Sequence, residues 1–184
     1  MTGRLIYIVG PSGAGKDALL DYARSHLTER DRARVRFVRR WITRPAGSVG
    51  EDHQPVTHEE FERMAAAGQF AMAWRANGNG YGIGREIRDW LAEGVTVVVS
   101  GSREYLPKAL KDFPDLQVVS VTVSPLVLRG RLEKRGRESA EEIEKRLERA
   151  AKFALPQGIN ALEIRNDLAV EAAGKEMLAA ILGH

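Results

Sequence analysis

The chain has 184 residues, of which 43% are hydrophobic and 29% charged, a composition typical of one globular domain with a modest insertion. Its net charge of +3 comes from 28 lysines and arginines scattered among 25 acidic residues, which argues against a nucleic-acid partner. The absence of cysteine excludes disulfides and thiolate metal sites. No apolar run approaches the roughly 20 residues of a membrane span, and the run at 5–9 is too short for a secretion signal, so we expect a cytoplasmic protein without a membrane partner.

The stretch Gly10–Asp17 lies between the apolar run at 5–9, which predicts a buried strand, and a helix predicted at 16–27. This context and the pattern G-x-x-x-x-G-K predict a phosphate-binding loop. Its glycines allow the backbone N–H groups to turn inward, and the helix N-terminus adds partial positive charge. We expect Lys16 to neutralise the β- and γ-phosphates of ATP or GTP. The predicted nucleotide contacts are Gly10, Pro11, Ser12, Gly13, Ala14, Gly15, Lys16, Asp17 and Ala18.

Asp17 occupies the position where this motif ordinarily carries serine or threonine. A carboxylate there can bind Mg²⁺ directly or through water, because magnesium prefers hard oxygen ligands. Aspartate also suits the first turn of a helix, where the positive end of the dipole favours an acidic side chain. Both interpretations stand, and we favour the first, which makes Asp17 the candidate metal ligand.

The sequence pattern of residues 41–83 differs from that of the rest of the chain and predicts an inserted substrate-binding lobe. A half-buried strand is predicted just before it, at 34–39. Thr57-His58-Glu59-Glu60 is a capping box that opens a helix ending at Gly68. A short strand at 70–74 and a turn-rich stretch at 77–82 follow. We favour Phe70 and Trp74 as core residues of this lobe over a stacking platform, and His53 as an ordinary surface histidine over a substrate contact.

Helices and strands alternate through the second half of the chain. Helices are predicted at 85–93, 105–113 and 168–182, and strands at 95–100, 116–123 and 161–164. This alternation indicates right-handed βαβ units, and therefore an α/β fold with a parallel sheet flanked by helices.

Between these elements, Pro125 begins a helix with several arginines, Gly136-Arg137-Glu138 interrupts it, and a capping box at Ser139–Glu142 begins another. One interpretation is a lid whose arginines stabilise a phosphate during transfer and exclude water. The other is a solvated hairpin held by salt bridges, since acidic residues alternate with the cations. Spacing alone does not separate the two.

Several motifs should be considered together: Gly10–Leu20, Thr43-Arg44-Pro45, Phe61, Phe70, Gly78, Tyr81-Gly82, Arg131–Arg146 and Asn166. They resemble the guanylate-kinase group of P-loop kinases, and the resemblance covers most of the chain. It implies a single domain: a five-stranded parallel sheet in a core of residues 1–40 and 84–184, an acceptor-binding lobe near 41–83 and a helical lid near 129–146.

The same resemblance implies roles for particular side chains. Arg131, Arg135 and Arg146 would clamp the transferred phosphate and act with Lys16 in catalysis. Arg44 and Tyr81 would contact the acceptor phosphate. Asn166 would contact the nucleotide.

The sequence also departs from guanylate kinases. Those enzymes read the guanine ring with a carboxylate where this chain has Met72, whose thioether cannot replace it. Ala46-Gly47 stands where they carry an arginine, and Ser100-Gly101-Ser102-Arg103 replaces their acidic residues after a central strand. GMP is therefore a poor acceptor candidate.

At these positions the chain resembles the family of ribose 1,5-bisphosphate phosphokinases, which act in phosphonate metabolism. The segments that carry this resemblance are Asp17, Gly50-Glu51-Asp52-His53, 76–83 and 100–103. It implies transfer of the γ-phosphoryl group of ATP, with Mg²⁺, onto ribose 1,5-bisphosphate to give 5-phosphoribosyl 1-diphosphate (PRPP) and ADP. A base-free acceptor with two phosphates needs cations and hydroxyls. The predicted acceptor contacts are Arg40, Arg44, Tyr81, Ser100 and Arg103.

Three alternatives remain at this point: a guanylate-type nucleoside monophosphate kinase, a non-catalytic guanylate-kinase-like binding module, and a nucleotide-dependent regulator with weak hydrolysis. Met72 argues against the first, and the presence of Lys16 and the lid arginines argues against the second. The sequence leaves the oligomeric state open between monomer and homodimer, and leaves open the donor preference between ATP and GTP.

Overall fold

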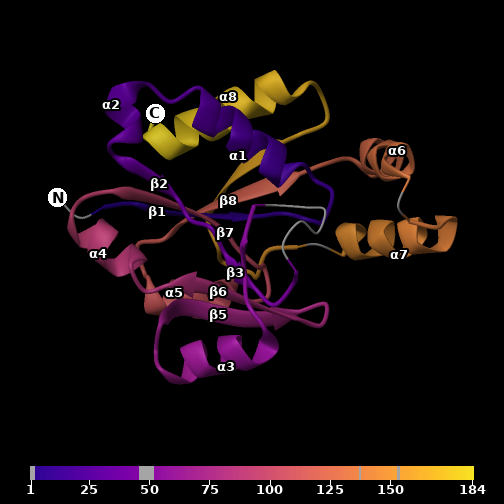
Figure 1. Cartoon of the computed structure of the whole chain (residues 1–184). Coiled ribbons are helices and arrows are strands. Elements are labelled where there is room, and N and C mark those ends of the chain that lie inside the picture. Colours follow the sequence, from indigo (N-terminus) through magenta and orange to yellow (C-terminus); the bar gives the residue numbers. More distant parts are fainter. Residues whose placement is uncertain (1–2, 46–51, 137, 153) are drawn as a thin grey trace. The chain divides into compact units, whose positions relative to one another are not determined.

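The computed structural model describes residues 3–45, 52–136, 138–152 and 154–184. Five strands form a parallel sheet in the order β2-β7-β1-β8-β9, which confirms the predicted α/β fold (Figure 1). The chain divides into two compact units. We call Ile6–Asp31 with Gln117–His184 the P-loop unit, and the segment ending at Leu5 with Arg32–Leu116 the lobe unit. The predicted features at Ala46-Gly47, Gly50-Glu51 and Arg137 lie outside the described residues.

The P-loop unit contains strands β1 (Leu5–Val9), β8 (Gln117–Thr122) and β9 (Ala161–Arg165), which pair in parallel. Every residue of β1 is buried, as an uninterrupted apolar run predicts for a central strand. Helices α1 (Lys16–Ser25) and α8 (Val170–Leu182) lie side by side in this unit, and α2 (Glu29–Arg32) follows α1 (Figure 1). A Cβ atom on Gly174 would lie 2.4 Å from the Tyr22 ring, so only glycine permits this close helix packing.

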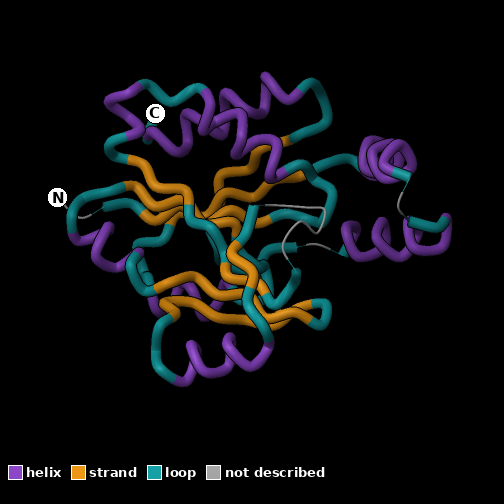
Figure 2. The backbone as a smooth tube through the Cα atoms, in the orientation of Figure 1, coloured by secondary structure: helices purple, strands orange, loops and turns teal. Residues whose placement is uncertain are grey.

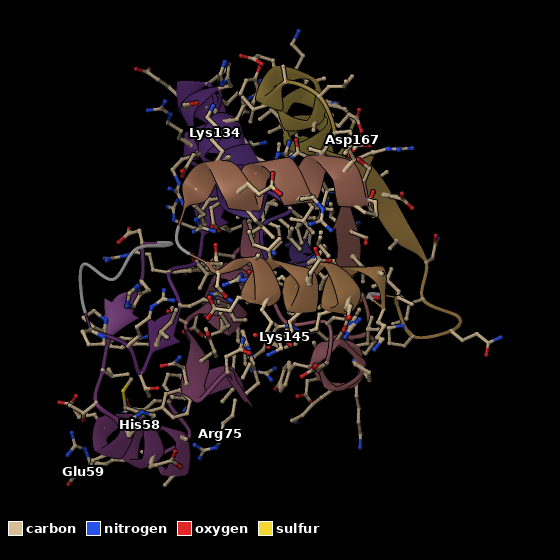
Figure 3. All side chains as sticks on the ribbon, turned by 90° about the vertical axis from the view of Figure 1, so that its right-hand side faces the viewer. His58, Glu59, Arg75, Lys134, Lys145 and Asp167 are labelled. Atoms are coloured by element: carbon tan, nitrogen blue, oxygen red, sulfur yellow. The ribbon has the colours of Figure 1, made fainter. Side chains whose placement is uncertain are left out.

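Helices α6 (Pro125–Arg135) and α7 (Ala140–Ala151) are neighbours in the P-loop unit, and Figure 3 shows Lys134 on α6 and Lys145 on α7. Helix α6 begins at Pro125 and α7 begins at the capping box of Ser139, as predicted. The Ser124 hydroxyl accepts a hydrogen bond at the start of α6, and the capping box of Ser139 and Glu142 is formed at the start of α7. Leu128, Leu132 and Ile143 pack together in a small hydrophobic cluster of their own.

The lobe unit contains the parallel pair β2 (Val35–Phe37) and β7 (Thr96–Ser100) and the helices α4 (Ile87–Ala92) and α5 (Leu106–Asp112). Its second sheet has the order β4-β3-β6-β5. The strands are drawn in orange in Figure 2. The strands of that sheet are β3 (Trp41–Ile42), β4 (Gln54–Pro55), β5 (Phe70–Ala76) and β6 (Asn79–Gly84), and helix α3 (His58–Ala66) lies between β4 and β5 in the chain. The predicted capping box of Thr57 and Glu60 is present at the start of α3.

The prediction of a turn-rich stretch at 77–82 was wrong for most of its length. Asn77 and Gly78, with φ of 49° and 75°, form a tight turn, and the next residues form β6, which pairs antiparallel with β5. An Asn-Gly pair between two strand-like segments is the usual signal for such a hairpin. The glycines of β6 are required by packing, because a Cβ on Gly82 would lie 2.5 Å from the Phe70 ring.

Other differences from the predicted elements are small. The strand predicted at 34–39 covers only Val35–Phe37, and the two-residue strands β3 and β4 are too short to give a periodic signal. Phe70 packs beside Phe61 with ring centroids 5.0 Å apart, as expected of a lobe core residue. No helix in the described part of the chain is both long and apolar enough to span a membrane.

Candidate functional site

The predicted phosphate-binding loop has the backbone that its glycines allow. Gly13 and Gly15 have φ of 91° and 87°, in the left-handed region, and α1 begins directly afterwards at Lys16. A Cβ atom on Gly15 would lie 2.4 Å from the side-chain nitrogen of Asn166. Glycine is therefore needed at this position both for its backbone angles and for the close approach of Asn166.

The loop is anchored through the backbone carbonyl of Ala14. Asn166 is 3% exposed and donates a 2.7 Å hydrogen bond from Nδ2 to this carbonyl, and Arg131 Nη1 donates to it at 3.5 Å. The Oδ1 atom of Asn166 is buried, with no hydrogen-bond partner among the described residues. Asn166 thus supports the loop backbone, while its predicted contact with the nucleotide stays a prediction.

Lys16 lies along the loop that precedes it. Its Nζ donates to the carbonyls of Gly10 at 2.8 Å and Pro11 at 3.1 Å. The ammonium group is therefore held beside the loop in the free protein. A bound phosphate chain offers charged acceptors to the same group, and charge-assisted hydrogen bonds are stronger than those to neutral carbonyls.

Arg146 connects α7 to the loop through a hydrogen bond of 2.8 Å from Nη1 to the Ser12 hydroxyl. Its Nη2 also forms a 2.9 Å ion pair with Glu138, whose side chain is only 10% exposed. The Oε2 atom of Glu138 is buried and has no partner in the described ranges. Glu138 therefore holds Arg146 in place against the loop, a role that its position between the two helices did not reveal in the sequence.

Both interpretations of the α6–α7 segment describe part of it. Arg129 pairs with Glu144 and Lys145 with Glu141 on the exposed surface, as expected of a salt-bridged hairpin. The bond to Arg129 lowers the pKa of the Glu144 carboxyl. Arg131 and Arg146 instead reach the loop, as expected of a lid.

Arg135 and Asp17 are among the predicted site residues of the P-loop unit that are exposed. Arg135 is the last residue of α6, and Asp17 lies in the first turn of α1. No group of three or more histidine, cysteine or acidic side chains that could hold a metal occurs among the described residues. The Mg²⁺ role of Asp17 and the phosphate contact of Arg135 stay predictions.

In the lobe unit, planar side chains pack around Tyr81. Trp74 lies opposite Tyr81 across β5 and β6, and their rings stack with centroids 5.6 Å apart and planes 5° from parallel. The Arg40 guanidinium lies 5.2 Å from the centroid of the same Tyr81 ring. Tyr105 continues the group, with its ring centroid 5.5 Å from Trp74, and burial raises the pKa of its hydroxyl. Trp74 thus supports Tyr81, a predicted acceptor residue, a role that the choice of a core position did not capture.

Arg44 lines a pocket of about 500 Å³ together with Thr43, Pro45 and residues 55–58 and 60. Its Nε atom is buried without a hydrogen-bond partner among the residues that the structure describes. The residue before it is fixed by β6, because Thr43 exchanges two hydrogen bonds with Gly80 at 3.1 and 2.8 Å. Buried polar atoms are usually satisfied, so an unsatisfied Arg44 Nε is available to a ligand.

Ser100 is the last residue of β7, and its hydroxyl oxygen is likewise buried without a partner in the described part of the chain. Arg103 follows in the next turn, with its guanidinium 4.0 Å from Glu104. Ligands of open α/β sheets bind beyond the carboxyl ends of the strands, which is where both residues lie.

The structure changes the interpretation of two other residues. His53 is 7% exposed and bonds to the carbonyl of Arg44, so the expectation of a surface histidine was wrong. Met72, which stands where guanylate kinases carry a base-reading carboxylate, is 1% exposed. Its thioether belongs to the core of the lobe unit.

Comparison with known proteins places this chain in a family. A family model described as an AAA domain matches residues 6–152. The chain is 56% identical over 154 residues to a ribose 1,5-bisphosphate phosphokinase PhnN of Pseudomonas paraeruginosa, covering 84% of this chain and 82% of the relative. It is 48% identical over 182 residues to the protein of that name from Chromobacterium violaceum, covering 99% and 95%. The chain belongs to the ribose 1,5-bisphosphate phosphokinase family.

Solved structures agree on the fold. A guanylate kinase from Anaplasma phagocytophilum superimposes with a TM-score of 0.68 at 18% identity, covering 99% of this chain and 86% of the other. At this identity the likeness establishes a shared fold only. This chain is thus guanylate-kinase-like in architecture, as the motifs predicted.

Proposed function

We propose that this chain transfers the γ-phosphoryl group of ATP to the 1-phosphate of ribose 1,5-bisphosphate, forming 5-phosphoribosyl 1-diphosphate and ADP. The observation that carries the proposal is the 48% identity over 182 residues to a relative named for this substrate. The acceptor side supports it, because Arg44 Nε and the Ser100 hydroxyl are buried polar atoms without partners in the described residues. A phosphorylated sugar supplies charged oxygens and hydroxyls that satisfy such groups.

Catalysis of this phosphoryl transfer depends on positioning the donor and acceptor phosphates rather than on proton transfer. The attacking phosphate oxygen is already ionised at neutral pH, so no general base is needed. Lys16 and the loop amides hold the donor phosphates, and Arg131, Arg135 and Arg146 stabilise the charge on the transferred group. Asn166 contacts the nucleotide side. On the acceptor side, Arg40, Arg44, Tyr81, Ser100 and Arg103 hold the sugar phosphate.

Magnesium fits the residues that are present. Mg²⁺ in kinases is commonly bound by one or two carboxylates together with the substrate phosphates, rather than by an all-protein cage. Asp17 offers one exposed carboxylate next to Lys16. We propose that Asp17 holds the ion, directly or through water, and that the ion neutralises charge on the donor phosphates.

The alternative acceptor is GMP. The likeness to a guanylate kinase at 18% identity carries the fold and no substrate. Met72 is fully buried and offers no carboxylate to a base. A non-catalytic binding module is also disfavoured, since Lys16 and Arg146 are both placed at the loop.

One experiment separates these functions. The purified protein is incubated with ATP and Mg²⁺ and with either ribose 1,5-bisphosphate or GMP, and the products are followed by phosphorus NMR. We expect new diphosphate resonances and ADP with the sugar phosphate and negligible turnover with GMP. Consumption of GMP without consumption of the sugar phosphate refutes the proposal. ATP hydrolysis independent of either acceptor indicates a nucleotide-dependent regulator instead.

A further inference from the structure

His53 is a buried histidine in the lobe unit that the proposed chemistry does not use. Its side chain is 7% exposed, and its Nε2 lies 3.1 Å from the carbonyl oxygen of Arg44. A carbonyl oxygen only accepts hydrogen bonds, so Nε2 must carry the proton in this contact.

The segment around His53 is fixed to the strand that leads to Arg44. Arg39 donates from Nη2 to the Asp52 carboxylate at 2.8 Å and to the His53 carbonyl at 3.2 Å. Further along, the Gln54 amide donates to the Arg40 carbonyl at 2.8 Å, and Val56 donates to Ile42 at 3.1 Å. The imidazole of His53 therefore projects from a segment that is itself held in place.

Arg44 is held on both sides of its peptide unit. The preceding residue, Thr43, exchanges two hydrogen bonds with Gly80, and the Arg44 carbonyl accepts from His53. Arg44 lines the pocket of about 500 Å³, and its Nε is buried without a hydrogen-bond partner among the residues that the structure describes. Fixing the backbone limits the freedom of this long side chain to its own torsions, which reduces the entropy lost on binding an anion.

We propose that His53 is a positioning residue that orients Arg44 for the phosphorylated acceptor by donating Nε2–H to its carbonyl. This inference rests on the proposed function for the identity of the acceptor. It assigns His53 an effect on acceptor binding and none on ATP binding. A histidine that merely filled space would be replaceable by an apolar side chain of similar volume.

The test compares His53→Leu with His53→Gln. Glutamine keeps an amide donor at about the distance of Nε2, whereas leucine removes it. We expect His53→Leu to raise the KM for ribose 1,5-bisphosphate about tenfold, the usual size of one lost hydrogen bond with a buried partner, with kcat and the KM for ATP within about twofold. His53→Gln should return the KM to within about threefold of wild type.

His26→Leu is the matched control, because His26 also bonds to a backbone carbonyl, that of Tyr22 at 2.8 Å, but is exposed and lies in the P-loop unit. It should leave both KM values unchanged. If His53→Leu does not fold, His53→Asn replaces it, since its shorter amide does not reach the Nε2 position. The proposal is overturned if His53→Leu leaves the KM for ribose 1,5-bisphosphate unchanged. It is also overturned if His53→Leu and His53→Gln each raise the KM for ribose 1,5-bisphosphate and the KM for ATP by the same factor.

A second measurement needs no substrate. Nitrogen-15 NMR of the free protein distinguishes an imidazole protonated at Nε2 from one protonated at Nδ1. We expect the Nε2–H tautomer for His53, and a neutral Nδ1–H ring contradicts the hydrogen bond to Arg44. If the wild-type protein fails to use ribose 1,5-bisphosphate, the proposed function fails, and this measurement still decides whether His53 holds Arg44.

Discussion

The predicted donor contacts of the P-loop unit and the predicted acceptor contacts of the lobe unit are built in different ways. In the P-loop unit the loop is a backbone structure, shaped by Gly13 and Gly15 and anchored through the Ala14 carbonyl by a buried asparagine. In the lobe unit the predicted contacts are side chains on short strands and turns, oriented by neighbours such as Trp74 and His53. A nucleoside triphosphate always presents the same phosphate chain, which backbone amides suit, whereas the choice of acceptor requires particular side chains.

This comparison predicts that changes in the P-loop unit act on turnover, and that changes in the lobe unit act on the acceptor KM. The largest effect is expected from Lys16→Ala, which removes the charge that we propose to neutralise the donor phosphates. We expect kcat to fall by at least about 10²-fold, as for other single groups that stabilise transferred charge, with an unchanged melting temperature. Lys145→Ala is the control, since Lys145 pairs with Glu141 on an exposed surface. Retention of more than about a tenth of the wild-type rate contradicts the assignment of the loop.

The second-largest effect is expected from Glu138→Gln, which removes the charge that holds Arg146 against the loop. Because Arg146 then loses its ion-pair partner and its fixed orientation, kcat should fall about tenfold while the KM for the sugar phosphate changes little. Glu144→Gln serves as the control, because it breaks an exposed pair with Arg129 that does not reach the loop. Equal effects of the two substitutions, measured by steady-state kinetics, argue against a lid that acts through Arg146.

A smaller effect, confined to the acceptor, is expected from Trp74→Leu. It removes the stacked partner of Tyr81, a contact worth about 1 kcal/mol, so the KM for ribose 1,5-bisphosphate should rise about fivefold at constant kcat and constant KM for ATP. Trp74→Phe, which keeps an aromatic ring, should lose less. Trp90→Leu on α4 provides a tryptophan control outside the predicted site. A change in the KM for ATP would contradict the prediction that substitutions in the lobe unit affect only the binding of the acceptor.

The smallest effects concern the capping boxes, one in each unit. Hydrogen bonds from the Thr57 and Ser139 backbone amides lower the pKa of Glu60 and Glu142 below the ordinary value of 4.5. A lowered folded-state pKa adds stability above the unfolded value, and this stability is lost as the pH falls through the folded value, below about pH 4.5. Melting temperatures measured from pH 7 to pH 3 should therefore fall less steeply in Glu60→Gln and Glu142→Gln than in wild type. Glu59→Gln, outside the box, should follow the wild-type curve.

The sequence predicted the P-loop unit better than the lobe unit, for physical reasons. The buried run of β1, the loop glycines and the caps of α3 and α7 are local signals, so their positions could be predicted without the fold. The burial of His53 depends on contacts with Arg39 and Arg44 that no spacing rule contains. The strand β6 was missed because its glycines favour turns, although here they admit the rings of Phe61 and Phe70.

The same distinction between local signals and contacts made by the fold applies to the predicted roles of site residues. Lys16 follows from a motif with a defined geometry, and the structure places its ammonium group at the loop. Glu138 was considered only as one acidic residue alternating with cations, because its ion pair with Arg146 depends on how the chain turns between α6 and α7. Trp74 and Tyr81 are partners only because β5 and β6 pair in one particular register.

The hydrophobic cluster of Leu128, Leu132 and Ile143 has a consequence for how quickly the protein can work. Because α6 and α7 bury these residues against each other, the pair can swing as one piece without exposing its own interior. Such a movement breaks the bond between Arg146 and Ser12 and the bond between Arg131 and the Ala14 carbonyl, and leaves the strand pairing of β1, β8 and β9 intact. We therefore expect the contacts of Arg146 and Arg131 with the loop to set the opening rate, and with it product release, while the folding stability of the sheet stays constant.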